Sequence, residues 1–126
     1  MTAPRPIPPL GRVFNSRAEA EVTHITEVEG RPLDTPVLLR NLMATPTMVL
    51  VETTFAKGQA SQPHMHPDHD SIVYVVSGRV KATIDGQEYV GGPGDCWYNA
   101  PGVIHHLEAL EDSVSVEIKS PPIRAW

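Results

Sequence analysis

The 126-residue sequence is poor in cysteine and has no cluster of basic residues, and each deficit excludes a class of protein. The single cysteine, Cys96, excludes an internal disulfide framework and any zinc site built mainly from cysteine. The lysines and arginines are scattered, and the formal net charge is −5. Because neutralising phosphates requires clustered cations, we expect no nucleic-acid partner.

Long hydrophobic stretches are also missing. No apolar run approaches the ~20 residues that span a bilayer, and the opening MTAPRPIPPL lacks the apolar segment of a secretory signal. We therefore expect no membrane partner and a cytoplasmic location. The length suits one domain with a hydrophobic core, here a single domain over residues 1–126. Residues 1–11 are expected to form an extended proline-rich arm, since proline fixes φ and disfavours helix.

Prolines and glycines are abundant, and the segments between them have strand composition. Thirteen prolines and nine glycines leave little room for long helices. Asp85-Gly86 predicts a hairpin, and residues 91–94 and Pro101-Gly102 predict two further turns. A short helix is expected at residues 16–20, capped by Ser16. The predicted strands are residues 22–28, 37–42, 48–55, 71–77, 79–84, 87–90, 95–98, 104–110 and 113–119. The fold class is therefore predicted to be all-β.

Histidines concentrate in two places. The stretch HMHPDHDS, residues 64–71, holds three histidines and two aspartates, and a second pair follows at 105–106. In a strand, His64 and His66 point to the same face, with Cα atoms about 6.5–7 Å apart. Their ring nitrogens can therefore converge on one metal ion at about 2.0–2.2 Å. His105 can supply a third ligand from a strand elsewhere in the barrel.

The spacing of these histidines and of the surrounding glycines resembles a known family. Gly58-x5-His64-x-His66-x3-Asp70-x7-Gly78, followed by Gly94-x6-Pro101-Gly102-x2-His105, is similar to the two conserved motifs of the cupin superfamily. The resemblance covers about residues 45–120. It implies that this segment is the core of a double-stranded β-helix, or jelly-roll barrel, of the small single-domain, metal-binding type (cupin type-2).

The resemblance also implies a ligand set for one divalent transition metal per chain, whether Fe, Mn, Ni, Cu or Zn. His64, His66 and His105 match the histidines of the two motifs. The family usually has glutamate after the first two histidines, and this chain has Asp70 as the nearest equivalent. The fourth ligand is therefore either Asp70 or, in a three-histidine site, water.

Other polar residues near the motifs leave alternatives open. Asp68 and His69 are expected in a solvated turn, although His66-x-Asp68 with a distal histidine is also the two-histidine, one-carboxylate pattern of non-haem iron oxygenases. Tyr74 and Tyr98 fall in predicted strands. They either pack within the barrel or present a hydroxyl to its cavity, where they would be catalytic candidates. Cys96 is expected to be a small buried hydrophobe.

Together these features predict a metal-dependent enzyme acting on a small oxygenated ligand: a keto or hydroxy acid, a sugar acid or a polyketide-like molecule. The reaction implied is isomerase, lyase or cyclase chemistry, with the metal stabilising an enolate as a Lewis acid. Two alternatives use the same residues: an iron-dependent dioxygenase with a three-histidine site, and a non-catalytic metal- or ligand-binding module. The resemblance further implies a homodimer, with the proline-rich arm reaching the neighbour.

Overall fold

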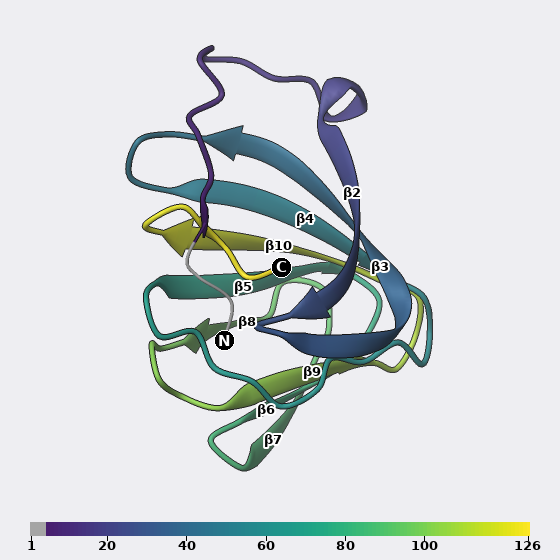
Figure 1. Ribbon diagram of the computed structural model, residues 1–126. Helices are drawn as coiled ribbons and strands as arrows, with labels where there is room; N and C mark the ends of the chain where they lie inside the picture. The colour runs from purple at the N-terminus through teal and green to yellow at the C-terminus, as the bar shows by residue number, and fades with distance from the viewer. Residues whose placement is uncertain (1–4) are drawn as a thin grey trace.

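The computed structural model describes residues 5–126, which form a barrel of antiparallel strands with no α-helix in that range (Figure 1). The one other regular element is a 3-10 helix, η1 (Arg17–Glu19). No helix among these residues is long and apolar enough to cross a bilayer. The all-β prediction is confirmed. The strands are β1 (Arg5–Pro6), β2 (Glu21–Val28), β3 (Arg31–Ala44), β4 (Val49–Phe55), β5 (Asp70–Ser77), β6 (Val80–Ile84), β7 (Gln87–Gly91), β8 (Cys96–Asn99), β9 (His105–Ala109), β10 (Ser113–Ser120) and β11 (Ile123–Arg124).

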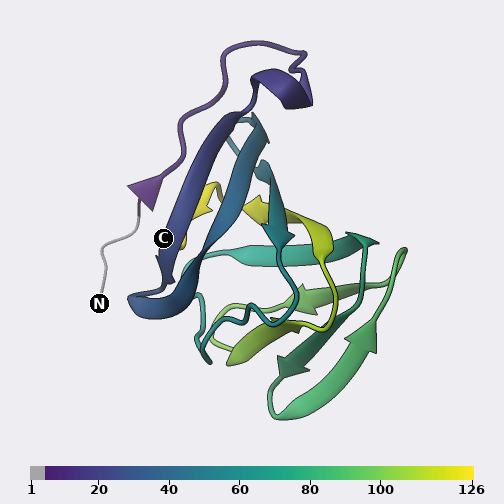
Figure 2. The same cartoon turned by 90° about the vertical axis from the view of Figure 1, so that its right-hand side faces the viewer.

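Two sheets make up the body of the barrel. The larger has six strands in the order β2-β3-β4-β10-β5-β8, and the smaller has three in the order β7-β6-β9. Figure 2 shows the β2–β3 hairpin at one side of the barrel and the β6–β7 hairpin at the other. Strand β10 lies between β4 and β5, so strands far apart in the chain become neighbours, as in jelly-roll folds.

Successive side chains of the central strands point alternately to the two faces of the sheet, and this decides which of them face the interior. On β5, Val73 and Val75 are buried, whereas Ile72 and Tyr74 are about half exposed. On the neighbouring β10 the buried positions include Lys119. Because side chains alternate across a strand, each of these strands presents one face to the cavity and the other to solvent.

Each predicted strand overlaps an observed one, but β3 begins six residues earlier than predicted, at Arg31 rather than at residue 37. The additional segment contains Pro32 and Pro36. In the structure this part of β3 pairs only with β2, at an edge of the sheet where a missing N–H is tolerated. The helix expected at residues 16–20 is wrong, since the segment forms only the 3-10 helix η1 and Ser16 makes no side-chain cap.

The described part of the proline-rich arm is held against its own chain. Strand β1 pairs with β11, and the Ile7 N–H donates to the Pro122 carbonyl at 2.7 Å. Ile7 itself is buried. Figure 1 shows this segment running beside the C-terminal end of the chain. Residues 5–7 are thus bound to the C-terminal part of their own chain, and residues 1–4 of the predicted arm lie outside the described part of the chain.

We expect Gly78→Ala to destabilise the fold more than Gly58→Ala. Both glycines have positive φ, +87° and +90°, and alanine there costs about 1–2 kcal/mol in backbone strain. A Cβ at Gly78 would also lie 2.7 Å from Ser113 Cα and closer still to the Asp112 carbonyl oxygen, whereas nothing lies within 4 Å at Gly58. Overpacking adds about 1–3 kcal/mol. Urea unfolding measures both variants, and equal losses would contradict this account.

Candidate metal centre

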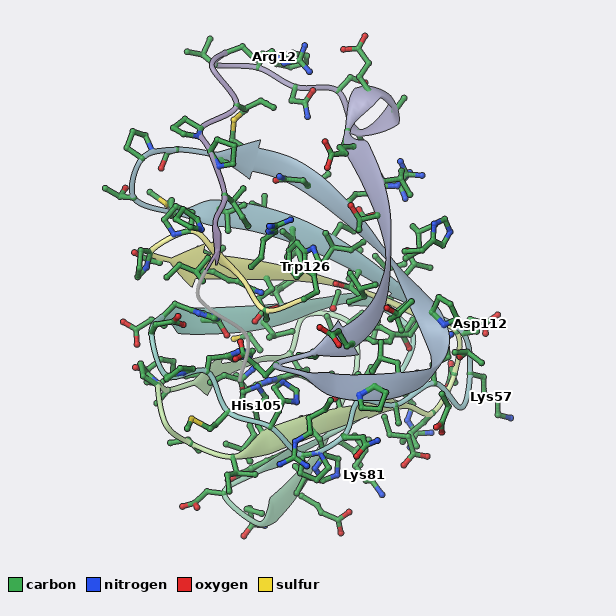
Figure 3. The ribbon with its side chains drawn as sticks, viewed as in Figure 1. Arg12, Lys57, Lys81, His105, Asp112 and Trp126 are labelled. Atoms are coloured by element: carbon green, nitrogen blue, oxygen red, sulfur yellow. The ribbon has the colours of Figure 1, made fainter. Side chains whose placement is uncertain are left out.

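Three histidines from the two motifs meet inside the barrel. One ring nitrogen from each of His64, His66 and His105 lies within 4.8 Å of the other two. The ring centroids are 4.4–5.0 Å apart, and no more than 9% of any of the three residues is exposed. Figure 3 shows His105 within the space that the strands enclose, while Lys57 and Asp112 lie at the periphery. The structure thus brings together the three predicted histidines.

Backbone hydrogen bonds fix the relative position of the two motifs. His64 and His105 form an isolated antiparallel bridge in which each N–H donates to the other's carbonyl, at 3.0 and 2.8 Å. The Gly102 N–H donates to the His66 carbonyl at 2.9 Å. Gly102 adopts φ +79°, which the Pro101-Gly102 turn requires. The side chains therefore converge because the main chains on either side are bonded to each other.

Each of the three imidazoles has its Nδ1 occupied by an oxygen acceptor. The Nδ1–H of His64 donates to the Gln62 carbonyl at 2.7 Å, and that of His105 donates to the Val103 carbonyl at 3.0 Å. His66 Nδ1 lies 3.1 Å from a carboxylate oxygen of Glu29. Such contacts set the tautomer and orient the ring, so Nε2 of each remains free to bind a metal.

Burial keeps these histidines neutral. It lowers the pKa of His64 to about 4, against the weaker opposing effect of the Gln62 carbonyl. Burial is also the main cause that lowers the pKa of His66 and of His105. A neutral imidazole has a lone pair on Nε2, which is the state a metal requires. The donor set therefore fits a divalent transition metal.

Glu29, the partner of His66, comes from outside both motifs. It lies in the two-residue turn between β2 and β3, where Glu29 and Gly30 have φ of 50° and 75°. Positive φ is unusual for glutamate, so the turn holds a strained residue at the site. Burial raises the pKa of Glu29 and nearby Asp68 raises it further, while Lys119 opposes both. No motif in the sequence had pointed to Glu29.

Asp70, the predicted fourth ligand, is not placed with the histidines. It begins β5 on the exposed face of the sheet, where it accepts a hydrogen bond from the Tyr98 hydroxyl at 2.5 Å. Ser71, the next residue along, is buried. The prediction for Asp70 is therefore corrected: the alternation of β5 directs its carboxylate outward, away from the metal-ligating nitrogens.

His69, rather than Asp70, lies beside the three histidines. It was expected in a solvated turn, but only 2% of it is exposed, and its ring centroid lies 4.4 Å from that of His66. Its Nδ1 lies 2.9 Å from an Asp68 carboxylate oxygen, and its Nε2 is buried with no hydrogen-bond partner among residues 5–126. His69 thus repeats the pattern of the other three: an occupied Nδ1 and an unused Nε2.

Tyr74 and Tyr98, the catalytic candidates, also face outward. Tyr74 is 46% exposed and Tyr98 is 54% exposed. They lie on the same outer face as Asp70, on β5 and β8, so neither hydroxyl is presented to the cavity. Cys96, expected to be buried, is an exposed free thiol on that face. These positions follow from strand alternation, which places Trp97 rather than Cys96 or Tyr98 against the cavity.

The histidines open into a cavity of about 110 Å³. One wall is apolar and comes from the β2–β3 hairpin, including Ile25, Val28 and Leu33. Strand β10 contributes two charged residues to the lining, Glu117 and Lys119, which face inward at alternate positions. The sequence alone had not identified either Glu117 or Lys119 as a residue of the site. The signal was available in SVSVEIKS, where polar residues recur at every second position of a predicted strand.

Comparison with known proteins agrees with this architecture. Residues 51–118 match the family model described as the cupin domain. Over 75 residues the chain is 33% identical to the pectin degradation protein KdgF of Dickeya dadantii (strain 3937), a match covering 59% of this chain and 68% of that protein.

Two solved structures extend the comparison. KdgF from a Halomonas species has a TM-score of 0.73 at 28% identity, covering 87% of this chain and 94% of that one. An RmlC-like cupin from Shewanella frigidimarina has a TM-score of 0.76 at 22% identity, covering 88% and 92%, and supports the fold alone. The predicted jelly-roll barrel is confirmed.

We expect His64→Ala, His66→Ala and His105→Ala each to lose stoichiometric metal, because each removes one of three converging nitrogens. His69→Ala should weaken metal binding more than Asp70→Ala, since His69 Nε2 is buried and unused whereas the Asp70 carboxylate faces outward. Elemental analysis and titration with Co(II), followed by its visible spectrum, measure both effects. Full metal content in the alanine variants of the triad, or the reverse order for His69 and Asp70, would contradict the assignment.

Proposed function

Because the chain belongs to the cupin family, we propose that it is a metal-dependent enzyme acting on a small oxygenated acid. The substrate class is a keto or hydroxy acid, a sugar acid or a polyketide-like molecule. The observation that supports the proposal is the set of three buried imidazoles, each with Nδ1 bonded to oxygen, opening into a cavity of about 110 Å³. A cavity of this size admits a small molecule.

In the proposed site one divalent transition metal is held by His64, His66 and His105, with His69 as the nearest further donor. When bound, it supplies Lewis-acid stabilisation of negative charge that develops on a substrate oxygen. Glu29 holds His66 in orientation, and Asp68 does the same for His69. The apolar wall from the β2–β3 hairpin limits the access of water to the cavity, which strengthens electrostatic interactions inside.

Glu117 is the candidate general base. It is the one acidic residue among the described residues that line the cavity, and its charge influences the pKa of both His64 and His105. A carboxylate in that position can take a proton from the carbon beside a carbonyl and return it to a neighbouring atom. Proton transfer of this kind underlies isomerase, lyase and cyclase reactions, which are the reaction classes we propose.

The names of two relatives bear on the substrate. The Dickeya protein is described as a pectin degradation protein, and the Halomonas structure carries the same name, KdgF. Pectin is a polymer of sugar acids. Within the proposed class, small sugar acids are therefore the first compounds to test.

We expect Glu117→Gln to lose turnover while it retains metal, because the amide keeps the shape of the side chain and cannot accept the proton. The protein is loaded anaerobically with Fe(II), Mn(II), Ni(II) or Zn(II) and assayed with small keto, hydroxy and sugar acids by NMR, with oxygen uptake recorded. Glu88→Gln, in an exposed residue of β7, is the matched control. Unchanged turnover in Glu117→Gln would contradict its role as the base.

The same assay separates the alternatives. Oxygen consumption with the iron form alone would indicate the dioxygenase. Ligand binding without conversion under any metal would indicate a non-catalytic binding module. Conversion without oxygen uptake, retained across redox-inactive metals, supports the isomerase, lyase or cyclase proposal, since none of those reactions needs an electron acceptor.

We also propose a homodimer that pairs the outer faces of the larger sheet. Ile72 on β5 lies between Tyr98 on β8 and Ile118 on β10, and all three are about half exposed. With Tyr74 they form an apolar surface that a second copy can cover. We expect Tyr74→Glu to give a monomer, because it buries a charge in the interface. Light scattering measures the mass, with exposed Tyr89→Glu on β7 as the control, and a monomeric wild type would overturn the proposal.

A further inference from the structure

Lys119 is a buried cation on the wall of the cavity. It lies near the end of β10, paired with Val49 on β4 and with Ser71 on β5, both of them buried. Only 3% of Lys119 is exposed. Lysine is rarely buried to this extent unless its ammonium has a partner, so its partners decide how the residue is to be interpreted.

Within residues 5–126 the Lys119 ammonium makes no ion pair and no hydrogen bond to the protein. Among those residues, the Lys119 ammonium makes a cation–π contact with the ring of Trp126, whose centroid lies 4.9 Å from Nζ. Both residues line the cavity. Lys81 shows the usual arrangement, since it is more exposed and its Nζ lies 3.2 Å from Glu88 and 3.5 Å from Glu108. A cation–π contact offsets only part of the lost hydration of an ammonium.

The charges around Lys119 favour an anion. The four histidines nearby, His64, His66, His69 and His105, carry no negative charge in either protonation state. Neither Glu29 nor Glu117 approaches its Nζ within the 4.0 Å of an ion pair. A metal on the histidines would add positive charge to the same cavity. An acid group on a bound molecule would supply the charge-assisted hydrogen bond that the Lys119 ammonium lacks.

We propose that Lys119 and Trp126 form a carboxylate-binding subsite, which anchors the acid group of the ligand while its keto or hydroxyl oxygen faces the histidines. The carboxylate pairs with Nζ, and the Trp126 ring covers the ammonium and restricts water. Trp126 and His105, both labelled in Figure 3, line the same cavity. The subsite rests on the proposed function for its ligand class, but it requires only binding, not turnover.

The test compares acids with their neutral esters. Zinc-loaded protein is titrated by calorimetry with pyruvate and methyl pyruvate, and with D-galacturonate and its methyl ester. Within each pair the shape is similar and only the acid carries a charge. We expect wild type to prefer at least one acid over its ester, and Lys119→Met to lose about 10- to 100-fold in affinity for that acid. Lys119→Arg should keep the preference, as should the control Lys81→Met.

Zinc content and stability show whether Lys119→Met has lost the subsite alone or has also lost the metal or the fold. Zinc content should be the same in wild type and Lys119→Met, because Lys119 is not a ligand. The urea midpoint of Lys119→Met should be unchanged or higher, since methionine removes an unpaired buried charge. No acid preference in wild type, a preference that survives in Lys119→Met, or a large loss of stability in that variant would each overturn the subsite. Absence of turnover with the acid preference intact would instead count against the proposed enzyme alone.

Discussion

The two reciprocal hydrogen bonds between the main chains of His64 and His105 are the contact on which the site depends. They join segments 41 positions apart, in a barrel whose other strands are paired by longer ladders. A single antiparallel bridge places the two imidazoles side by side with a ring separation of 4.4 Å. The His66 carbonyl, bonded to Gly102, adds a second tie between the same segments. Convergence of the nitrogens is thus a property of the backbone, and the side chains need little further ordering to bind a metal.

Much of the fold could be predicted from the sequence because its signals are local. Asp85-Gly86 forms the two-residue turn with both φ values positive, 51° and 80°, that its chemistry favours. His64 and His66 share a face because they are two residues apart. His105 was predictable from its position after Pro101-Gly102. Each of these conclusions needed only a few neighbouring residues and the period of a strand.

The errors fall where both faces of a strand have similar composition. In β5 the inward Val73 and Val75 alternate with the outward Ile72 and Tyr74, so hydrophobicity alone does not show which set faces the cavity. The orientations of Asp70 and His69 depend on that choice. Asp70 was predicted as a ligand from its place in the cupin motif, and His69 was expected in a turn. Neither expectation used the face of β5, where a shift of one residue reverses the direction of every side chain.

In strand β10 the usual arrangement, with apolar residues inside and polar residues outside, is reversed. Its polar residues face the interior, because the interior there is a cavity lined by polar groups that include the histidines, while Val114, Val116 and Ile118 face out. A reading based on amphipathicity alone would place Glu117 and Lys119 in water. The exposed apolar residues of β5, β8 and β10 form one surface, so the same reversal exposes the face that we propose for dimerisation.

The β2–β3 hairpin lies outside the segment that matches the cupin family, residues 51–118, yet it forms the apolar wall of the cavity and supplies Glu29. The metal-ligating histidines and the apolar wall are therefore encoded in separate stretches of the chain, which the Glu29–His66 contact connects. Ile25, Val28 and Leu33 can change in size without altering any of the histidines. With Glu29 retained as the partner of His66, these three apolar side chains are therefore the natural positions to vary when the selectivity of the barrel is redesigned.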